Sequence, residues 1–314
     1  MRKFVINSND CGQRADKFIM KVSDIPKSLM YKFIRTKKIK LNRKKFEISY
    51  RLQEGDIMEF YIDDSFFHDD KNIPFCNAPS DIDIVYEDSN IIIINKPVGT
   101  IIHSDKNNTD NTLADSVKNY LYKKGEYDPF LEASFSPAVC NRLDRNTCGM
   151  VIAAKNAAAL REINEIIRSG KIHKKYLCIA VNCPEKLSGT IKAYHFKDDK
   201  LNKVFISDTK KTGYKQIITK YKVLENNNNL CLMEIELVTG RSHQIRASLA
   251  HIGCPVLGDT KYGIKSANDR FNVYYQALCA YSLRFEADSQ SELSYLNDRE
   301  FKIDMHNIWF NKIF

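Results

Sequence analysis

The sequence predicts an α+β protein in which a small N-terminal α/β domain precedes a larger domain built on a mixed, largely antiparallel sheet. Its 314 residues are enough for two domains. Apolar residues make up 43% and charged residues 28%, the balance of a globular chain that buries its own core. After about residue 80, short strand-like segments outnumber helical ones, and the sequence has no internal repeat.

The N-terminal domain is expected over residues 1–62. Apolar residues at helical spacing predict helices at Asp16–Val22 and Ser28–Lys37. Two short strands are expected at Ile39–Leu41 and Ile57–Ile62, the second of them after a Gly-Asp turn.

Residues 63–80 change character and are predicted to form a linker. Asp, Asn and Pro dominate this segment, and it has no periodicity. The run His68-Asp69-Asp70 offers side chains that bind metals, but no partner cluster at ligand spacing follows it. A polar connector is therefore favoured over a metal site.

The second domain is predicted over residues 81–314, starting with a hairpin from Ile82–Tyr86 and Ile91–Asn95. Further strands are expected at Gly149–Ala154, Lys175–Val181, Gln216–Leu224, Leu230–Val238 and Leu278–Phe285. Helices are expected at Leu113–Tyr122, Ala157–Ser169 and Ser242–His251, and Ser242 is a candidate cap for the last of them.

The positive charge of the chain is concentrated at its N-terminus. Residues 1–62 contain 15 Lys and Arg against 7 Asp and Glu, whereas residues 63–314 contain 33 against 32. A basic module on a near-neutral body suits the binding of a polyanion, although a solvated lysine-rich surface explains the numbers equally well. The candidate contacts are Lys27, Lys32, Arg35, Lys37, Lys38, Arg43 and Lys44.

Several classes of protein are disfavoured. No stretch approaches the roughly 18 apolar residues of a membrane span, and the N-terminus lacks an apolar secretory segment. Nine cysteines, an odd number without regular spacing, indicate reduced thiols and a cytoplasmic protein. The sequence has no Cys-x-x-Cys, no glycine-rich nucleotide loop and no zinc motif, so neither a cofactor nor a metal is expected.

Two polar segments are the strongest candidates for a site. In the first, Asn141–Gly149, Asp144 stands between two arginines, so its carboxylate is expected to be ionised and able to act as a nucleophile or base. For this segment taken alone, a structural Arg–Asp bridge is the favoured explanation. In the second, Thr239–Arg246, a strand leads through a glycine turn into a helix. Arg246 lies at the edge of the helix's buried stripe, where its head is able to enter a cleft or remain in solvent.

A third segment, Ile172–Leu177, opens a strand and contains Tyr176. This ring is able to stack on a nucleic-acid base, although a strand tyrosine is more often core packing.

Together these segments resemble the RluA family of RNA pseudouridine synthases. Asn141–Gly149 is similar to the family's His-Arg-Leu-Asp-x-x-Thr-Ser-Gly signature, and Thr239–Arg246 to Thr-Gly-Arg-Thr-His-Gln-Ile-Arg. The likeness extends over about residues 81–286 and includes Lys174-Lys175-Tyr176, Asn95-Lys96-Pro97-Val98-Gly99, Gly253–Asp259 and Gln276–Ala280. Residues 1–62 resemble the small RNA-binding domain named after ribosomal protein S-four, through Arg14–Phe18, Ile34–Asn42 and Leu52–Asp56.

The resemblance implies the pseudouridine synthase fold and conversion of uridine to pseudouridine in RNA without a cofactor. It implies that Asp144 is the catalytic carboxylate, that Arg246 pairs with it, and that Tyr176 stacks on the base and assists proton removal. Arg142 is expected to occupy the gap left by a flipped nucleotide, and Asn141 and His243 to bind substrate. The chain departs from the family at Asn141, usually histidine, and at Cys148, usually serine.

The implied substrate is structured RNA, with large-subunit (23S) ribosomal RNA favoured and transfer RNA open. The expected state is a monomer without a membrane partner. A non-catalytic RNA-binding or ribosome-assembly factor on the same fold is the alternative, because two signature residues differ. A metal-dependent nuclease would need clustered acids, and Asp63-Asp64, Asp69-Asp70 and Asp198-Asp199 are the available pairs.

Overall fold

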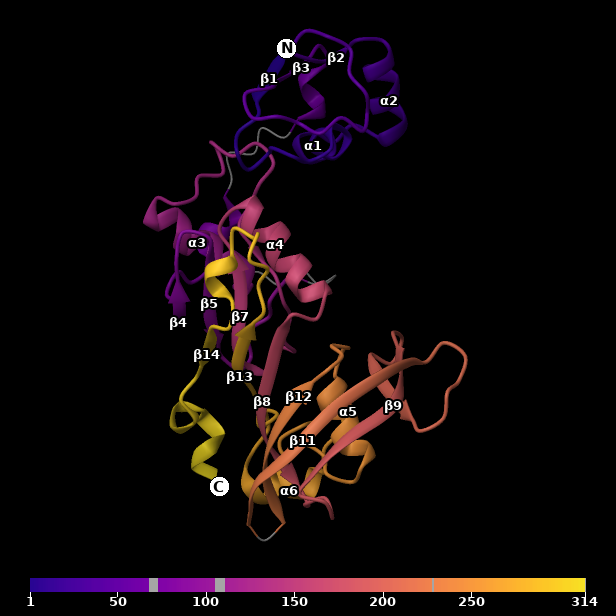
Figure 1. The fold of residues 1–314 in the computed structure, drawn as a ribbon, viewed down its shortest axis with the longest axis vertical. Helices are drawn as coiled ribbons and strands as arrows, with labels where there is room; N and C mark the ends of the chain where they lie inside the picture. The colour runs from indigo at the N-terminus through magenta and orange to yellow at the C-terminus, as the bar shows by residue number, and fades with distance from the viewer. Residues whose placement is uncertain (68–72, 105–110, 228, 314) are drawn as a thin grey trace.

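The computed structural model describes residues 1–67, 73–104, 111–227 and 229–313. It has the predicted α+β architecture, with a small three-stranded sheet at the N-terminus and a large, mostly antiparallel sheet in the body. In Figure 1 the small domain lies at one end of the long axis, beyond α4 (Ala157–Arg168) of the body. The run His68-Asp69-Asp70 lies outside the described residues.

The N-terminal domain is a three-stranded antiparallel sheet, in the order β1-β3-β2, packed against two helices. Its elements are β1 (Arg2–Val5), α1 (Ala15–Val22), α2 (Lys27–Arg35), β2 (Ile39–Leu41) and β3 (Ile57–Phe60). The short strand β1 was not predicted from the sequence. The second helix was predicted to extend too far, because Lys37 has a left-handed backbone (φ 60°) that ends the helical path.

Aromatic side chains from residues 63–80 pack into both domains. Phe67 is buried in the core of the small domain, and Phe66 makes an edge-on contact with Phe33 there. Phe75 packs into the core of the body beside Tyr127. The division into residues 1–62, 63–80 and 81–314 stays a prediction, but the connecting segment contributes apolar contacts at both ends.

The large sheet has eleven strands among the described residues, in the order β10-β9-β11-β12-β8-β13-β7-β5-β4, with β14 beside β13 and β6 beside β7. All its pairs are antiparallel except β7 with β13. The strands are β4 (Ile84–Glu87), β5 (Ile91–Lys96), β6 (Ala138–Val139), β7 (Cys148–Ala154), β8 (Ile172–Val181), β9 (Ser188–Asp198), β10 (Lys203–Ser207), β11 (Lys215–Asn227), β12 (Leu230–Leu237), β13 (Leu278–Phe285) and β14 (Glu300–Lys302).

Helices cover both faces of the β5–β7 part of the sheet. Ile92 and Ile94 face α3 (Leu113–Lys124), whereas Ile91 and Ile93 face α4. Because both faces of β5 are buried, all four residues of Ile91–Ile94 are apolar, and the strand has no alternation of apolar and polar residues. Farther along the sheet, α5 (Gln244–His251) covers one face, and α6 (Lys265–Phe271) and the C-terminal residues cover the other.

The outer strands β9 and β10, together with α6 and β14, were not predicted. Their apolar pattern is weak because one face is exposed to solvent: in β9 the buried residues are Ile191, Ala193 and His195, with polar side chains between them. Within the described ranges, no helix combines the length and apolar content needed to cross a bilayer.

Candidate active site

The loop that contains Asp144 leads directly into β7. Asn141 Oδ1 accepts a hydrogen bond from the backbone N–H of Ile152 (2.7 Å), which ties the start of the loop to the strand. Gly149 has a φ of 112°, and a side chain there would place its Cβ 2.4 Å from the Ala280 carbonyl oxygen of β13. The glycine therefore allows β13 to approach β7 where the two strands run parallel.

Asp144 is bound by an arginine that lies 102 residues later in the chain. Arg246 Nη1 donates to Asp144 Oδ2 at 2.6 Å, while its Nε and Nη2 donate to Asp259 at 2.6 and 2.9 Å. The Asp259 side chain is fully buried, whereas that of Asp144 is 28% exposed. Burial raises the pKa of Asp259, but the hydrogen bonds and charge of Arg246 lower it by more than burial raises it. The pKa is therefore below its ordinary value, and Asp259 is ionised.

The two arginines beside Asp144 in the sequence do not bind it. Arg145 Nε donates to the carbonyl oxygen of Gly99 (3.1 Å), and Arg142 is exposed at the edge of the pocket. The local Arg–Asp bridge considered from the sequence is thus replaced by a long-range pair.

The turn before α5 is held by Gln244 and not by the predicted Ser242 cap. The Gln244 side chain accepts from the Thr239 hydroxyl and the Arg241 N–H, and donates to Ile218 O and Thr219 Oγ1. Ser242 makes no side-chain cap in the described structure, and His243, in a left-handed conformation (φ 51°), precedes the helix.

A pocket that is open to solvent lies beside Asp144. Its walls come from the Asp144 loop, β8 and the start of α5, and they include Arg142, Asp144, Tyr176, Arg241, His243 and Arg246. Five of the six residues predicted to act in catalysis or substrate binding therefore meet at one place. The sixth, Asn141, is buried and bonded to β7.

Tyr176 is both a core residue and a wall of the pocket. It is 6% exposed and belongs to the core cluster that β8 forms with β12 and α5, yet it also lines the pocket. Burial, followed by the charge of Asp144, raises the pKa of its phenol. The hydroxyl is therefore protonated at neutral pH, which favours a stacking role over that of a base.

Lys96 is hydrogen-bonded to the backbone of the loop that contains Asp144. It was not assigned a role from the sequence. Its fully buried ammonium donates to the carbonyl oxygens of Pro97, Arg145 and Thr100 at 2.9, 3.0 and 3.1 Å. Burial lowers its pKa to about 8, so it is largely charged at pH 7 and all three of its protons have acceptors. Its signal in the sequence was the Asn-Lys-Pro-Val-Gly segment.

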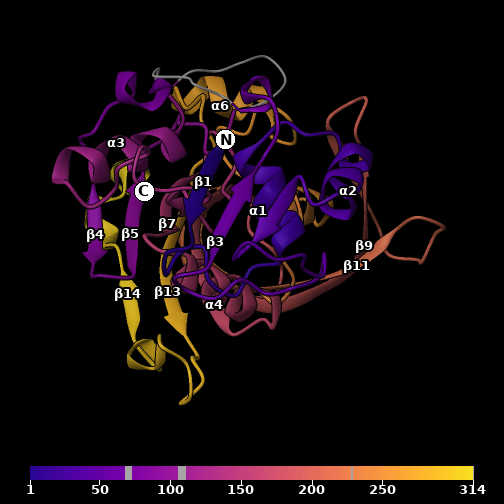
Figure 2. The same ribbon diagram turned by 90° about the horizontal axis from the view of Figure 1, so that it is seen from above.

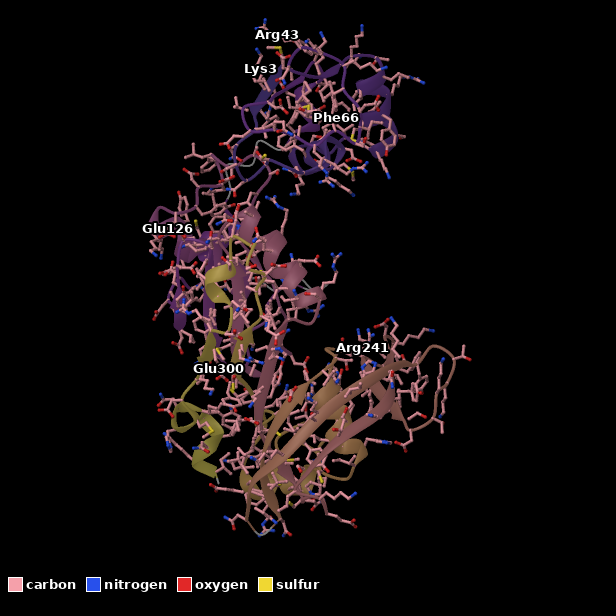
Figure 3. The ribbon with its side chains drawn as sticks, in the orientation of Figure 1. Lys3, Arg43, Phe66, Glu126, Arg241 and Glu300 are labelled. Carbon is pink, nitrogen blue, oxygen red and sulfur yellow. The ribbon has the colours of Figure 1, made fainter. Side chains whose placement is uncertain are left out.

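The basic residues of the N-terminal domain lie away from the pocket, and all seven candidates are exposed. In Figures 1 and 2, α2 lies on the same side of the molecule as β9 and β11. Figure 3 shows Arg241 on the part of the body that faces the small domain and Arg43 at the far end of that domain. The residues of α2 thus lie on the side of β9 and β11, whereas Arg43 lies at the end of the small domain away from Arg241.

A second basic segment, residues 188–222, was hidden in the near-neutral total of the body. It spans β9, β10 and much of β11 and contains nine Lys against three Asp. Phe196 stacks on Tyr214 at 5.2 Å between ring centroids, and Lys211 lies over the Tyr214 ring. The segment therefore combines basic and aromatic side chains, and its strands β9 and β11 lie on the side of the molecule where α2 lies (Figure 2).

The acidic pairs considered as metal ligands have local roles where they are described. Asp63 accepts from the Ser65 N–H, Asp198 from the backbone of Lys200 and Leu201, and Asp199 pairs with Lys197. Among the described residues, no group of three or more His, Cys, Asp or Glu is arranged to hold a metal.

Known proteins are similar to this chain over nearly its whole length. The family model described as RNA pseudouridylate synthase matches residues 90–251, about half of the chain. An RNA pseudouridine synthase of Mycoplasma capricolum is 35% identical over 311 residues, covering 95% of this chain and 96% of that protein. The chain belongs to the RNA pseudouridylate synthase family.

This synthase is an isomerase of the RluA type, as the motifs indicated, and RNA is its substrate. The ribosomal large subunit pseudouridine synthase C of Rickettsia bellii is 32% identical and covers 84% of this chain and 85% of its own length. Human RNA pseudouridylate synthase domain containing 1 shares the fold, with a TM-score of 0.55 at 20% identity over 78% of this chain and 97% of that one.

Proposed function

We propose that the synthase converts specific uridines in structured RNA, with large-subunit (23S) ribosomal RNA as the favoured target, to pseudouridine, using Asp144 and no cofactor. The observation that carries this proposal is the Asp144–Arg246 ion pair at the wall of the pocket. The names of ribosomal relatives such as the Rickettsia bellii synthase favour a ribosomal target.

Asp144 has one oxygen available for chemistry. Oδ2 is bonded to Arg246, and no hydrogen bond among the described residues occupies Oδ1. The ion pair orients the carboxylate. Attack on the ribose C1′ and removal of a ribose proton both begin at such an oxygen, so either step is available to it.

The remaining steps need no oxidant and no added water. The C1′–N1 bond breaks, the uracil turns within the pocket, and C5 forms a new bond to C1′. If Asp144 had attacked C1′, its bond to C1′ breaks as C5 bonds; if it had taken a ribose proton, that proton returns to the ribose. The proton leaves C5, N1 gains a proton, and the product has the same atoms as the substrate. Tyr176 supplies a flat wall for the base.

Arg142 is proposed to enter the base stack when the target nucleotide leaves it. It is exposed at the edge of the pocket, two residues from Asp144, where a guanidinium is able to reach the RNA. Unstacking a base costs about a few kcal/mol, and an inserted planar cation offsets part of that cost.

The basic residues of the N-terminal domain and of residues 188–222 are proposed to bind the RNA backbone outside the pocket. Shape and spacing then select the substrate, since A-form RNA is read largely by shape.

The non-catalytic alternative rested on Asn141 and Cys148, and neither lines the pocket. Asn141 bonds to the backbone of Ile152, and Cys148 is buried against Leu278 of β13. Both departures from the signature therefore lie outside the lining of the pocket.

The test is pseudouridine mapping of total RNA from cells with and without the gene, and with the Asp144→Asn variant restored. Sites that vanish without the protein and stay absent with the variant support the proposal, and their positions identify the RNA. If all sites persist, or if Asp144→Asn restores them, the proposal is wrong.

A further inference from the structure

His243 lies at the wall of the pocket and has one ring nitrogen fixed by the protein. It precedes α5 and is half-buried. Nδ1 lies 2.9 Å from the hydroxyl oxygen of Tyr262, and the ring lines the pocket beside Asp144. The hydrogen-bonding directions of the two ring nitrogens diverge, so Nε2 is left for a different partner while Nδ1 binds Tyr262. No hydrogen bond to Nε2 is present among the described residues.

The hydrogen bonds around Tyr262 determine which nitrogen carries the proton. The Val204 backbone N–H donates to the Tyr262 hydroxyl oxygen at 2.8 Å. The hydroxyl proton is then free to bond Nδ1. If Nδ1 carried a proton instead, the hydroxyl would accept twice, and its own proton would have no acceptor among the described residues.

We propose that Tyr262 holds His243 in the tautomer protonated at Nε2, and that this N–H donates a hydrogen bond to a carbonyl oxygen of the target uracil. The inference rests on the proposed function, because it assigns a contact within that pocket. His243 is thereby a catalytic residue and Tyr262 a positioning residue.

The surroundings of the two rings support this arrangement. The Tyr262 ring is itself held, since the Arg246 guanidinium lies 5.3 Å from its centroid and the His243 ring meets it edge-on at 5.7 Å. Burial lowers the pKa of His243. The charges of Arg246 and Lys261 act in the same direction, while those of Asp144 and Asp259 oppose them. A neutral imidazole has a single ring proton, so its position matters.

A neutral donor at this position suits the bond-breaking step. When the C1′–N1 bond breaks, its electron pair goes to the uracil, and the negative charge spreads over N1 and the carbonyl oxygens. A fixed N–H that points at one of these oxygens stabilises that charge, and the proton stays on the imidazole throughout. Arg246 is already bound to Asp144 and Asp259, so it is not the donor for this charge.

The first test reads the tautomer without RNA. Nitrogen-15 NMR of the full-length protein distinguishes a ring nitrogen with a proton from one without, and His243→Gln identifies the signals of His243 among the seven histidines. The expected result is a proton on Nε2 in the wild type and a mixture of tautomers in Tyr262→Phe, which keeps the ring. A proton on Nδ1 in the wild type would overturn the proposal.

The second test measures single-turnover rates on the RNA found by mapping. We expect His243→Ala to lower the chemical rate roughly 100-fold with little change in RNA affinity, as for loss of a donor to developing charge. Tyr262→Phe is expected to cost about tenfold. His243→Gln, which keeps a side-chain N–H, is expected to recover part of the loss. Tyr274→Phe makes the same chemical change at an exposed tyrosine and is the control.

The double variant separates positioning from general structural damage. If Tyr262 acts through His243, Tyr262→Phe adds no further loss in the His243→Ala background. A full additional loss overturns the positioning role. A protein with the expected tautomer that forms no pseudouridine contradicts the proposed function and, with it, the uracil contact, but not the tautomer.

Discussion

Asp259 holds Arg246 through two hydrogen bonds, from Nε and Nη2, so that Nη1 points to Asp144. Two nearly parallel bonds to one carboxylate fix the plane of a guanidinium, and the direction of its remaining donor is then set by the protein. Asp259 is fully buried and holds Arg246 in place. Asp144 is partly exposed, so a molecule in the pocket is able to reach it.

Asp259→Asn is expected to reduce both turnover and stability. The change removes the buried counter-charge of Arg246, and breaking a buried pair costs about 3–5 kcal/mol. We expect the rate to fall by about 100-fold, as for loss of a residue that orients an active group. Urea unfolding and single-turnover assays measure the two effects. Asp144→Asn is the matched control, expected to abolish turnover with a smaller loss of stability. Wild-type turnover in Asp259→Asn would refute the supporting role.

Arg142 and Arg145 form a matched pair for testing insertion into the RNA. Arg142→Ala is expected to lower kcat/KM by about tenfold or more on a structured RNA, and much less on an unpaired oligonucleotide whose target base needs no unstacking. Arg145, whose Nε binds Gly99 O, is the control. Arg145→Ala is expected to affect both RNAs alike. Equal losses on both RNAs for Arg142→Ala would contradict the insertion role.

The basic residues of α2 are expected to contribute more to RNA binding than those at the far end of the small domain. Replacing Lys32 and Arg35 by Gln should weaken binding and reduce the slope of log K against log salt by about 0.7–0.9 for each phosphate that the protein no longer neutralises. The comparison is the double replacement of Arg43 and Lys44, since Arg43 lies at the end away from Arg241. Equal changes in slope would show that both ends of the domain bind RNA.

Glu87 is expected to make stability depend on pH in the acidic range. Burial alone would raise the pKa of Glu87, but hydrogen bonds from Lys124, Lys155 and Tyr120 have the larger effect. Together they lower the pKa from its ordinary value of 4.5 to about 2. The unfolded chain therefore binds more protons in this range, and the stabilisation is complete above pH 4.5 and lost as the pH falls toward 2.

Glu87→Gln should lower the free energy of unfolding by up to about 3 kcal/mol at pH 7, with the difference from wild type shrinking below pH 4.5. Urea denaturation at several pH values measures this. Glu165→Gln, which breaks a solvent-exposed pair with Arg168, is the control and is expected to change little. A difference that stays constant down to pH 3 would show that Glu87 acts without its charge.

The sequence predicted strands best where both faces of the sheet are buried. Runs such as Ile91–Ile94 are apolar throughout, and only a covered strand explains them. The outer strand β9 was not predicted, because one of its faces is exposed to solvent and carries lysines. Its composition is therefore similar to that of a loop. The end of α2 depended on the backbone of Lys37, which residue type alone does not specify.

Site residues that stand in a short sequence motif could be predicted. Those whose role depends on contacts with residues distant in the sequence could not. Asp144, Tyr176 and Arg246 stand in recognisable segments. The supporting roles of Lys96, Tyr262 and Asp259 follow from contacts with residues far along the chain, such as Arg145 O for Lys96 and Val204 N for Tyr262. Asn141 was expected to touch substrate because of its place in the motif. In the structure its amide is committed to the backbone of Ile152.

The central place of β13 has a consequence for the enzyme during its own synthesis. The strand is made after β7 and β8, yet it lies between them and joins the two parts of the sheet. Residues as late as Phe310 pack against the same region. While a chain is still being translated, the Asp144 loop and the helix of Arg246 belong to two unconnected half-sheets. A growing chain is therefore expected to be inactive until its last strands leave the ribosome.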